Sequence, residues 1–180
     1  MFSSDDADLQ RAFRNIISNE SLTDYILDIA ELVCIGEFNM ININAILSQH
    51  NISSVNDIKN ELLDVILFYI NDVLKDGIID EKEKKNIEVL KLHFKIKEGD
   101  FYKYKYNEIG NILHVEFQKL YFDNRISREE AKHNFKLRYI FDLSHSQFDK
   151  FKENEVLRAL ENGANITDLD TSIIPKKFKN

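Results

Sequence analysis

Apolar residues recur along this chain at spacings of three and four, which is the period of amphipathic helices rather than of strands. The pattern predicts helices over about residues 3–17, 21–35, 38–49, 53–75, 81–94, 100–122, 128–141 and 146–161. The stretch 53–75 is apolar on more than one face, so we expect it to be the central, buried helix. The sequence therefore predicts an all-α fold, a helical bundle of about seven or eight helices.

A helix-turn-helix element at residues 74–105 occurs again at residues 121–152, displaced by 47 positions. The matched positions are Asp76 with Asp123, Gly77 with Asn124, Ile79 with Ile126, Asp80 with Ser127, and Glu83 with Glu130. Gly77 and Asn124 are residue types that readily adopt positive φ in a tight turn. Asp80 and Ser127 can cap the following helix, with Glu83 and Glu130 as the second half of a capping box. The pattern indicates one internal helix-turn-helix repeat.

The length and composition fit one folded domain. The chain has 180 residues, of which 43% are hydrophobic and 31% are charged, enough to form a real core. We expect a single all-helical domain over residues 1–163, ending at Gly163. The remaining residues 164–180 carry the only proline and a lysine-rich end (Lys176, Lys177 and Lys179), and we interpret them as a C-terminal arm or tail.

The charge and the cysteine count narrow the function. The net charge is −7, which argues against nucleic-acid binding, because that requires a basic face, and favours a basic partner. Cys34 is the only cysteine, so there is no disulfide framework and a reducing compartment is favoured. The N-terminus is acidic where a signal peptide is basic, and no apolar run reaches the length of a membrane span. We therefore expect a cytoplasmic protein with no membrane partner.

Four acids around the first turn fit part of a calcium loop. Asp72, Asp76, Asp80 and Glu83 stand at the first, fifth, ninth and twelfth positions of that scheme. Leu74 occupies the third position, where an oxygen ligand is expected, so the same acids also fit simple capping roles. The five histidines form no cluster with metal-binding spacing. We expect no cofactor and no metal, with divalent-metal binding by these four acids as the alternative.

Arg128 and His133 have a spacing that resembles the Arg-x4-His signature of HEPN-type ribonucleases. In such a site the histidine acts as general acid or base and the arginine holds phosphate. Glu129 and Glu130 lie beside Arg128 and would repel a phosphate. We therefore expect no enzymatic activity, and ribonuclease activity is the third hypothesis.

The turn formed by Asp76, Gly77, Ile79, Asp80 and Glu83, echoed by Asp123, Ile126 and Glu130, resembles the tellurite-resistance TerB-like family. The resemblance covers about residues 55–162. It implies an all-helical domain of pseudo-repeated helix pairs, a role in stress response, and divalent-metal binding at an acidic surface. The chain departs from that pattern in its second turn, where Asn124 and Arg125 replace the glycine turn and Ser127 replaces an acid.

A small acidic chain with no catalytic constellation also resembles bacterial immunity proteins, which bind and block a cognate toxin. Many such toxins are basic nucleases, so charge complementarity would give an acidic inhibitor speed and specificity. Our first hypothesis is a non-enzymatic immunity or inhibitor protein, of the kind used in contact-dependent inhibition, that neutralises a basic toxin. We expect its partner-binding residues to be Asp76, Asp80, Glu81, Glu83, Glu129 and Glu130. Each of these acids also fits a purely helix-stabilising role.

Overall fold

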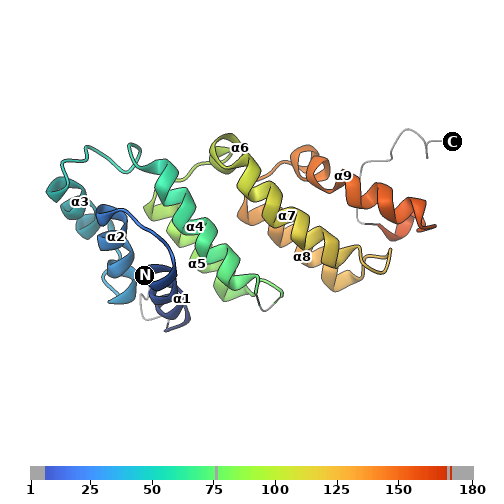
Figure 1. Ribbon diagram of the computed structural model, residues 1–180, viewed down its shortest axis with the longest axis horizontal. Coiled ribbons are helices and arrows are strands. Elements are labelled where there is room, and N and C mark those ends of the chain that lie inside the picture. The colour runs from blue at the N-terminus through green and yellow to red at the C-terminus, as the bar shows by residue number, and fades with distance from the viewer. Residues whose placement is uncertain (1–6, 76, 170, 172–180) are drawn as a thin grey trace. The chain divides into compact units, whose positions relative to one another are not determined.

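The computed structural model describes residues 7–75, 77–169 and 171 (Figure 1). In these residues the chain forms nine α-helices and one short 3₁₀ helix, η1: α1 (Ala7–Asn19), α2 (Asp24–Cys34), α3 (Met40–Gln49), α4 (Lys59–Val73), α5 (Glu81–His93), α6 (Asp100–Tyr104), α7 (Tyr106–Leu120), α8 (Arg128–Ile140), α9 (His145–Glu161) and η1 (Ile166–Asp168). The predicted all-α fold is confirmed. The expected start of the first helix, near residue 3, lies outside the described residues.

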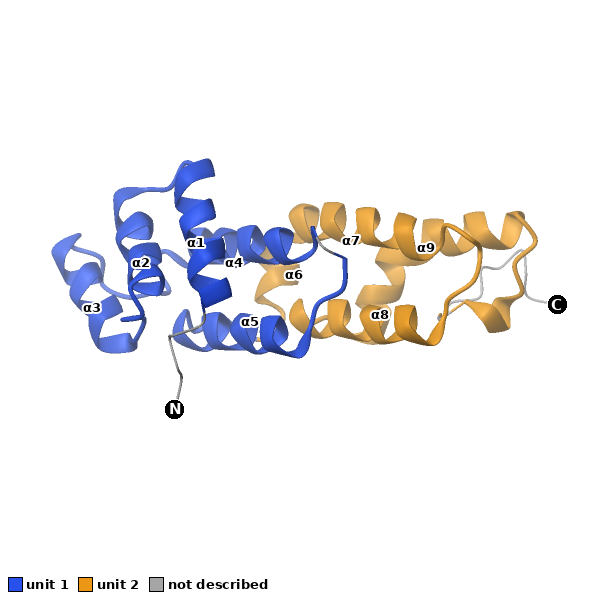
Figure 2. Cartoon of the chain, turned by 90° about the horizontal axis from the view of Figure 1, so that it is seen from below, with its two compact units in different colours: residues 1–97 blue, residues 98–180 orange. Residues whose placement is uncertain are grey.

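The chain divides by its contacts into two compact units, residues 1–97 and residues 98–180 (Figure 2). In unit 1, α1 packs against α2 and α4, α2 packs against α3, and α4 packs against α5. In unit 2, α7 packs against both α6 and α9. The single domain expected over residues 1–163 stays a prediction.

The stretch expected to form the most buried helix is α4. It buries eight side chains: Leu62, Leu63, Val65, Ile66, Leu67, Tyr69, Ile70 and Val73. The helix begins at Lys59 rather than near residue 53, because the preceding residues form a turn in which the backbone N–H of Ser54 donates to Asp57 Oδ2 at 3.0 Å. Side chains on more than one face of α4 are therefore removed from water, which is a large stabilising term.

The repeat is confirmed in the backbone. α7 begins and ends 47 positions after α4 begins and ends, and α8 does the same relative to α5. The turns also match, since Gly77 and Asn124 have φ of 113° and 62°. The helix ends match as well, since Lys95 and Asp142 have φ of 53° and 51°. The same sequence of cap, helix and left-handed end is used in both units.

The long helix expected over residues 100–122 is wrong, because Lys105 separates α6 from α7. Its backbone has φ −132° and ψ 33°, outside the helical region. The Lys105 N–H still donates to the Phe101 carbonyl, and its carbonyl still accepts from Ile109, both at 2.9 Å. Lys105 is also buried, at 4% exposure. Tertiary packing therefore overrides helix propensity at one residue that no glycine or proline marks. This break is why nine helices are seen where about seven or eight were expected.

The described chain after Gly163 contacts the preceding residues of unit 2. The backbone N–H of Ile126 donates to the carbonyl of Asp168 at 2.8 Å, and Leu169 is 3% exposed. The lysine-rich end of the expected arm, Lys176, Lys177 and Lys179, lies outside the described residues. No helix in the part of the chain that the structure describes has both the length and the apolar character needed to cross a membrane.

Candidate functional site

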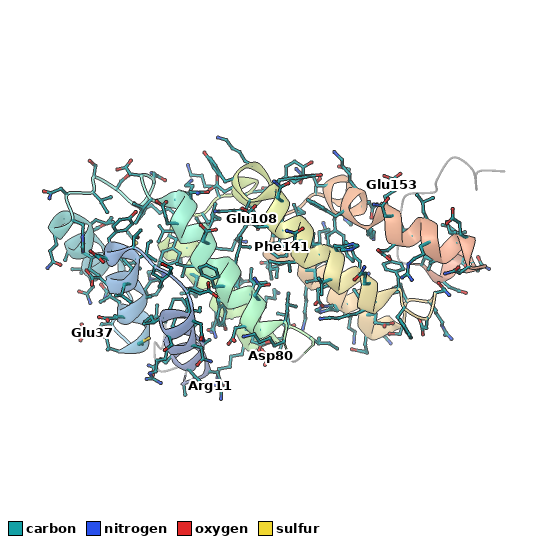
Figure 3. All side chains as sticks on the ribbon, in the orientation of Figure 1. Arg11, Glu37, Asp80, Glu108, Phe141 and Glu153 are labelled. Atoms are coloured by element: carbon teal, nitrogen blue, oxygen red, sulfur yellow. The ribbon has the colours of Figure 1, made fainter. Side chains whose placement is uncertain are left out.

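The first acidic turn is built into the start of α5. Asp80, labelled in Figure 3, is the N-cap. Its Oδ1 accepts from the N–H of Glu83 at 2.7 Å, and Glu83 Oε2 accepts from the N–H of Asp80 at 2.7 Å. The predicted capping box is therefore confirmed. Glu81 projects outward with its side chain 75% exposed, 3.8 Å from Lys84 Nζ. Asp76, also expected at this surface, lies outside the described residues.

The second acidic turn repeats the arrangement at the start of α8. Ser127 Oγ accepts from the N–H of Glu130 at 3.2 Å, and Glu130 Oε2 accepts from the N–H of Ser127 at 2.7 Å. Glu129 is 69% exposed at its side chain and lies 2.7 Å from Lys132 Nζ. Of the two adjacent acids expected in this turn, Glu129 is thus exposed, and Glu130 takes part in the capping box of α8.

The expected acids fall into two kinds. Asp80, Glu83 and Glu130 satisfy backbone N–H groups, which is the helix-stabilising role that the sequence also allowed. Glu81 and Glu129 present exposed carboxylates beside lysines of their own helix. Such surface ion pairs contribute only about 0–1 kcal/mol, so a cation from a partner can replace the lysine at little cost. These two carboxylates are the ones best suited to binding.

Three of the four calcium-loop acids, Asp72, Asp80 and Glu83, are engaged in other contacts, and the fourth, Asp76, lies outside the described residues. Asp72 lies within α4, and its Oδ1 accepts from Lys75 Nζ at 2.8 Å. Leu74, at the position that lacks a ligand, is buried at 5% exposure. Asp80 and Glu83 form the capping box. Among the described residues, no group of three or more His, Cys, Asp or Glu side chains is placed to hold a metal ion.

The structure separates the two residues of the ribonuclease hypothesis. Arg128 is the first residue of α8 and is exposed. His133 is buried, at 2% exposure, and its Nε2 lies 3.2 Å from Glu116 Oε2. A histidine enclosed in this way contacts a carboxylate of its own unit and is not presented to a nucleic-acid strand at the surface.

A pocket of about 340 Å³ lies between α8 and α9, and the sequence did not predict it. Its buried lining consists of Asn134, Phe148, Asp149 and Lys152. Its more exposed lining consists of Ala131, Phe135, Arg138, His145 and Thr171. Helical spacing explains the set, because the α8 residues at 131, 134, 135 and 138 and the α9 residues at 145, 148, 149 and 152 each occupy one helix face.

The floor of the pocket is charged. Lys152 Nζ lies 3.0 Å from Asp149 Oδ1, and both side chains are more than nine-tenths buried, at 4% and 6% exposure. The same Nζ lies 5.2 Å from the centre of the Phe148 ring, which adds a cation–π contact. The floor therefore presents a fixed ion pair and an aromatic face.

The rim of the pocket combines aromatic rings with an arginine. The Arg138 guanidinium lies over the Phe135 ring, 5.3 Å from its centre. The Phe135 and Tyr139 rings are stacked with centres 6.3 Å apart, and they are 53% and 42% exposed. Arg138 and Tyr139 also border a second hollow of about 170 Å³. Exposed aromatic and arginine side chains of this kind are typical of binding surfaces.

No family model, curated protein or solved structure matches this chain. The resemblances to TerB-like proteins and to immunity proteins therefore stay predictions.

One signal in the sequence could have indicated the pocket. Phe135, Arg138 and Tyr139 place two aromatics and an arginine on the side of α8 that faces away from the core. The matching positions of the first repeat are Glu88, Lys91 and Leu92, so the substitution pattern is specific to the second copy. Alignment of the two copies along their whole length, and not only at their turns, shows this difference in the sequence alone.

Proposed function

We propose that this chain is a non-enzymatic protein-binding module, an immunity or inhibitor protein that neutralises a basic, nuclease-type bacterial toxin by occluding it. The observation that carries the proposal is the repeated acidic helix start. In both units a capping box fixes the first turn of a helix, α5 or α8, beside an exposed carboxylate, Glu81 or Glu129. The chain as a whole carries a net charge of −7.

Two physical effects make these turns suitable for a basic partner. The negative charge of the chain attracts a cationic surface over distances of about a Debye length, which raises the association rate at low salt. The capping boxes hold the backbone of both turns in place before binding, so little ordering entropy is lost on association. The partner's Lys and Arg side chains would take the places of Lys84 and Lys132.

The first test uses the tagged full chain as bait in an extract of its native cell, with elution by salt and identification of partners by mass. Support requires one stoichiometric, basic protein whose activity the purified chain inhibits. With that partner in hand, association rates are measured at several ionic strengths. Absence of a basic partner at low salt would overturn the proposal.

The residues are then tested by removing charge without changing shape. Glu81→Gln and Glu129→Gln are expected to slow association and to flatten its dependence on salt. Glu153→Gln is the matched control, because Glu153 is exposed on α9 and the substitution changes the net charge by the same amount (Figure 3). Equal effects from all three variants would show that net charge alone acts and that the two turns are not the binding surface.

A further inference from the structure

The pocket between α8 and α9 has the size of a small-molecule site. Its volume of about 340 Å³ falls within the range of about 300–1,000 Å³ that is usual for ligand pockets. Asn134 and Phe148 are 1% and 3% exposed, so the floor lies well below the surface. A ligand seated there would contact both α8 and α9.

The formal charges around the pocket are net positive in an otherwise acidic protein. Arg138 and Lys152 contribute two positive charges and Asp149 one negative charge, which leaves +1 with His145 neutral. Lys152 is already paired with Asp149. Arg138 instead lies over the Phe135 ring, and its planar guanidinium suits two-point binding of a carboxylate or phosphate.

The first repeat provides an internal control for the polar floor. At the position of Asn134, the first copy has Ile87, which is fully buried in α5. At the positions of Phe135 and Arg138 it has Glu88 and Lys91. α5 therefore buries an apolar residue where α8 buries an amide, while the position of Lys152 holds a buried lysine, Lys105, in the first copy as well. The buried amide of Asn134 is therefore specific to the second copy, whereas a buried lysine is common to both copies.

We infer that the α8–α9 pocket binds a small organic anion, a carboxylate or phosphate carried on a planar ring. The anionic group would meet the Arg138 guanidinium at the rim, with the Asn134 amide and the Lys152 ammonium beneath it. The ring would lie against Phe135 and Phe148. This site is separate from the acidic turns and does not depend on the proposed toxin binding.

The test uses the full chain labelled with ¹⁵N and four probes of similar size: phenyl phosphate, benzoate, benzyl alcohol and benzylamine. NMR titrations follow the side-chain amide of Asn134 and the backbone amides of α8 and α9. We expect phenyl phosphate or benzoate to shift these signals saturably, and we expect the neutral and cationic probes not to do so. Whichever anion binds more tightly identifies the anionic group. Equal shifts with benzyl alcohol would overturn the inference.

Two variants locate the binding. Arg138→Gln is expected to weaken binding of the preferred anion about tenfold or more, because a charge-assisted hydrogen bond is lost. Lys91→Gln is its matched control at the equivalent position of the first repeat and is expected to leave the affinity unchanged. The melting temperature of each variant shows whether it is folded.

A double variant tests the floor of the pocket independently. Asp149→Leu combined with Lys152→Met replaces the buried pair with apolar side chains of similar volume, a change that buried ion pairs often tolerate. We expect a folded protein whose Asn134 amide no longer responds to the anion. Unchanged affinity in both this variant and Arg138→Gln would show that the anion binds elsewhere and would overturn the inference.

Discussion

His133 Nε2 lies 3.2 Å from Glu116 Oε2 inside unit 2, with the two side chains 2% and 4% exposed. Glu116 also lies 2.5 Å from Lys119 Nζ. At the equivalent positions of unit 1, the Asn86 amide donates to the Tyr69 hydroxyl at 3.1 Å. The same two places in the repeat therefore hold a neutral hydrogen bond in one unit and an ionisable pair in the other. At these two positions, unit 2 therefore has an ionisable contact where unit 1 has a neutral one.

The ionisable pair predicts a loss of stability in acid. Burial alone would raise the pKa of Glu116, but the hydrogen bonds from His133 and Lys119 and their positive charge lower it below its ordinary 4.5. Because the pKa of Glu116 is lower in the folded state than in the unfolded state, its ionised carboxylate stabilises the fold. This stabilisation is fully present above about pH 4.5 and is lost as the pH falls through the pKa of the folded state. We expect Glu116→Gln to be less stable than the wild type at pH 7 and to approach it in acid. Urea unfolding between pH 7 and pH 3 measures this, and a constant difference across that range would contradict the prediction.

Removing either Glu116 or His133 alone should lower the free energy of unfolding more than removing both. His133→Leu leaves the buried Glu116 carboxylate with Lys119 alone, and we expect it to lower the free energy of unfolding by about 2–3 kcal/mol. The double variant Glu116→Leu with His133→Leu removes the charge and fills the space, so we expect it to recover most of that loss. A double-mutant cycle from urea unfolding gives the coupling free energy. Additive single effects would show that the two side chains are not energetically coupled.

The capping boxes predict that Asp80 and Ser127, although different residue types, contribute about equally to the free energy of unfolding. Asp80 and Ser127 each accept a hydrogen bond from the N–H three residues later, so Asp80→Ala and Ser127→Ala should each lower the free energy of unfolding by about 1 kcal/mol. Thr23→Ala is the control, because Thr23 is the N-cap of α2 but its side chain makes no capping hydrogen bond. We expect that change to be well below 1 kcal/mol in the same urea experiment. A similar loss at Thr23 would mean that the side-chain hydrogen bonds are not the cause.

The features read correctly from the sequence are those fixed by local chemistry. Asp80, Ser127 and their glutamates could be identified because capping depends on residues only three positions apart. The break at Lys105 could not be predicted, since a lysine within a helical pattern gives no sign that it will be buried. The helix predicted over residues 21–35 also begins later than expected, since α2 starts at Asp24 after Thr23.

The pocket was missed for a related reason. Asn134, Asp149 and Lys152 are residue types usually found on a solvated face, and nothing local shows that α8 and α9 enclose them. Their burial depends on how two helices meet, which a hydrophobic pattern along one helix does not define. The described acids of the binding hypothesis lie at helix starts, as predicted, but which of them remain exposed became clear only from the contacts of Glu83 and Glu130.

The left-handed residues that end α5 and α8 give the last prediction. Lys95 and Asp142 have φ of 53° and 51°. The N–H of the residue after each donates back to a carbonyl of the helix: Ile96 N–H to the Lys91 carbonyl at 2.9 Å, and Leu143 N–H to the Arg138 carbonyl at 3.1 Å. Helices usually end this way at glycine, because a side chain is strained at positive φ. The gain from relieving this strain exceeds the extra unfolded-state freedom of glycine.

We therefore expect Lys95→Gly and Asp142→Gly each to raise the free energy of unfolding by about 0.5–1 kcal/mol. The reverse change provides the control, since Gly163 ends α9 with φ of 90° and a Cβ there would meet nothing within 4 Å. Gly163→Ala should thus lower the stability by about 1 kcal/mol through backbone strain alone. Thermal and urea unfolding of the three variants measure these changes. If Lys95→Gly and Asp142→Gly were both destabilising, the side chains at these helix ends would have to contribute contacts that outweigh the strain.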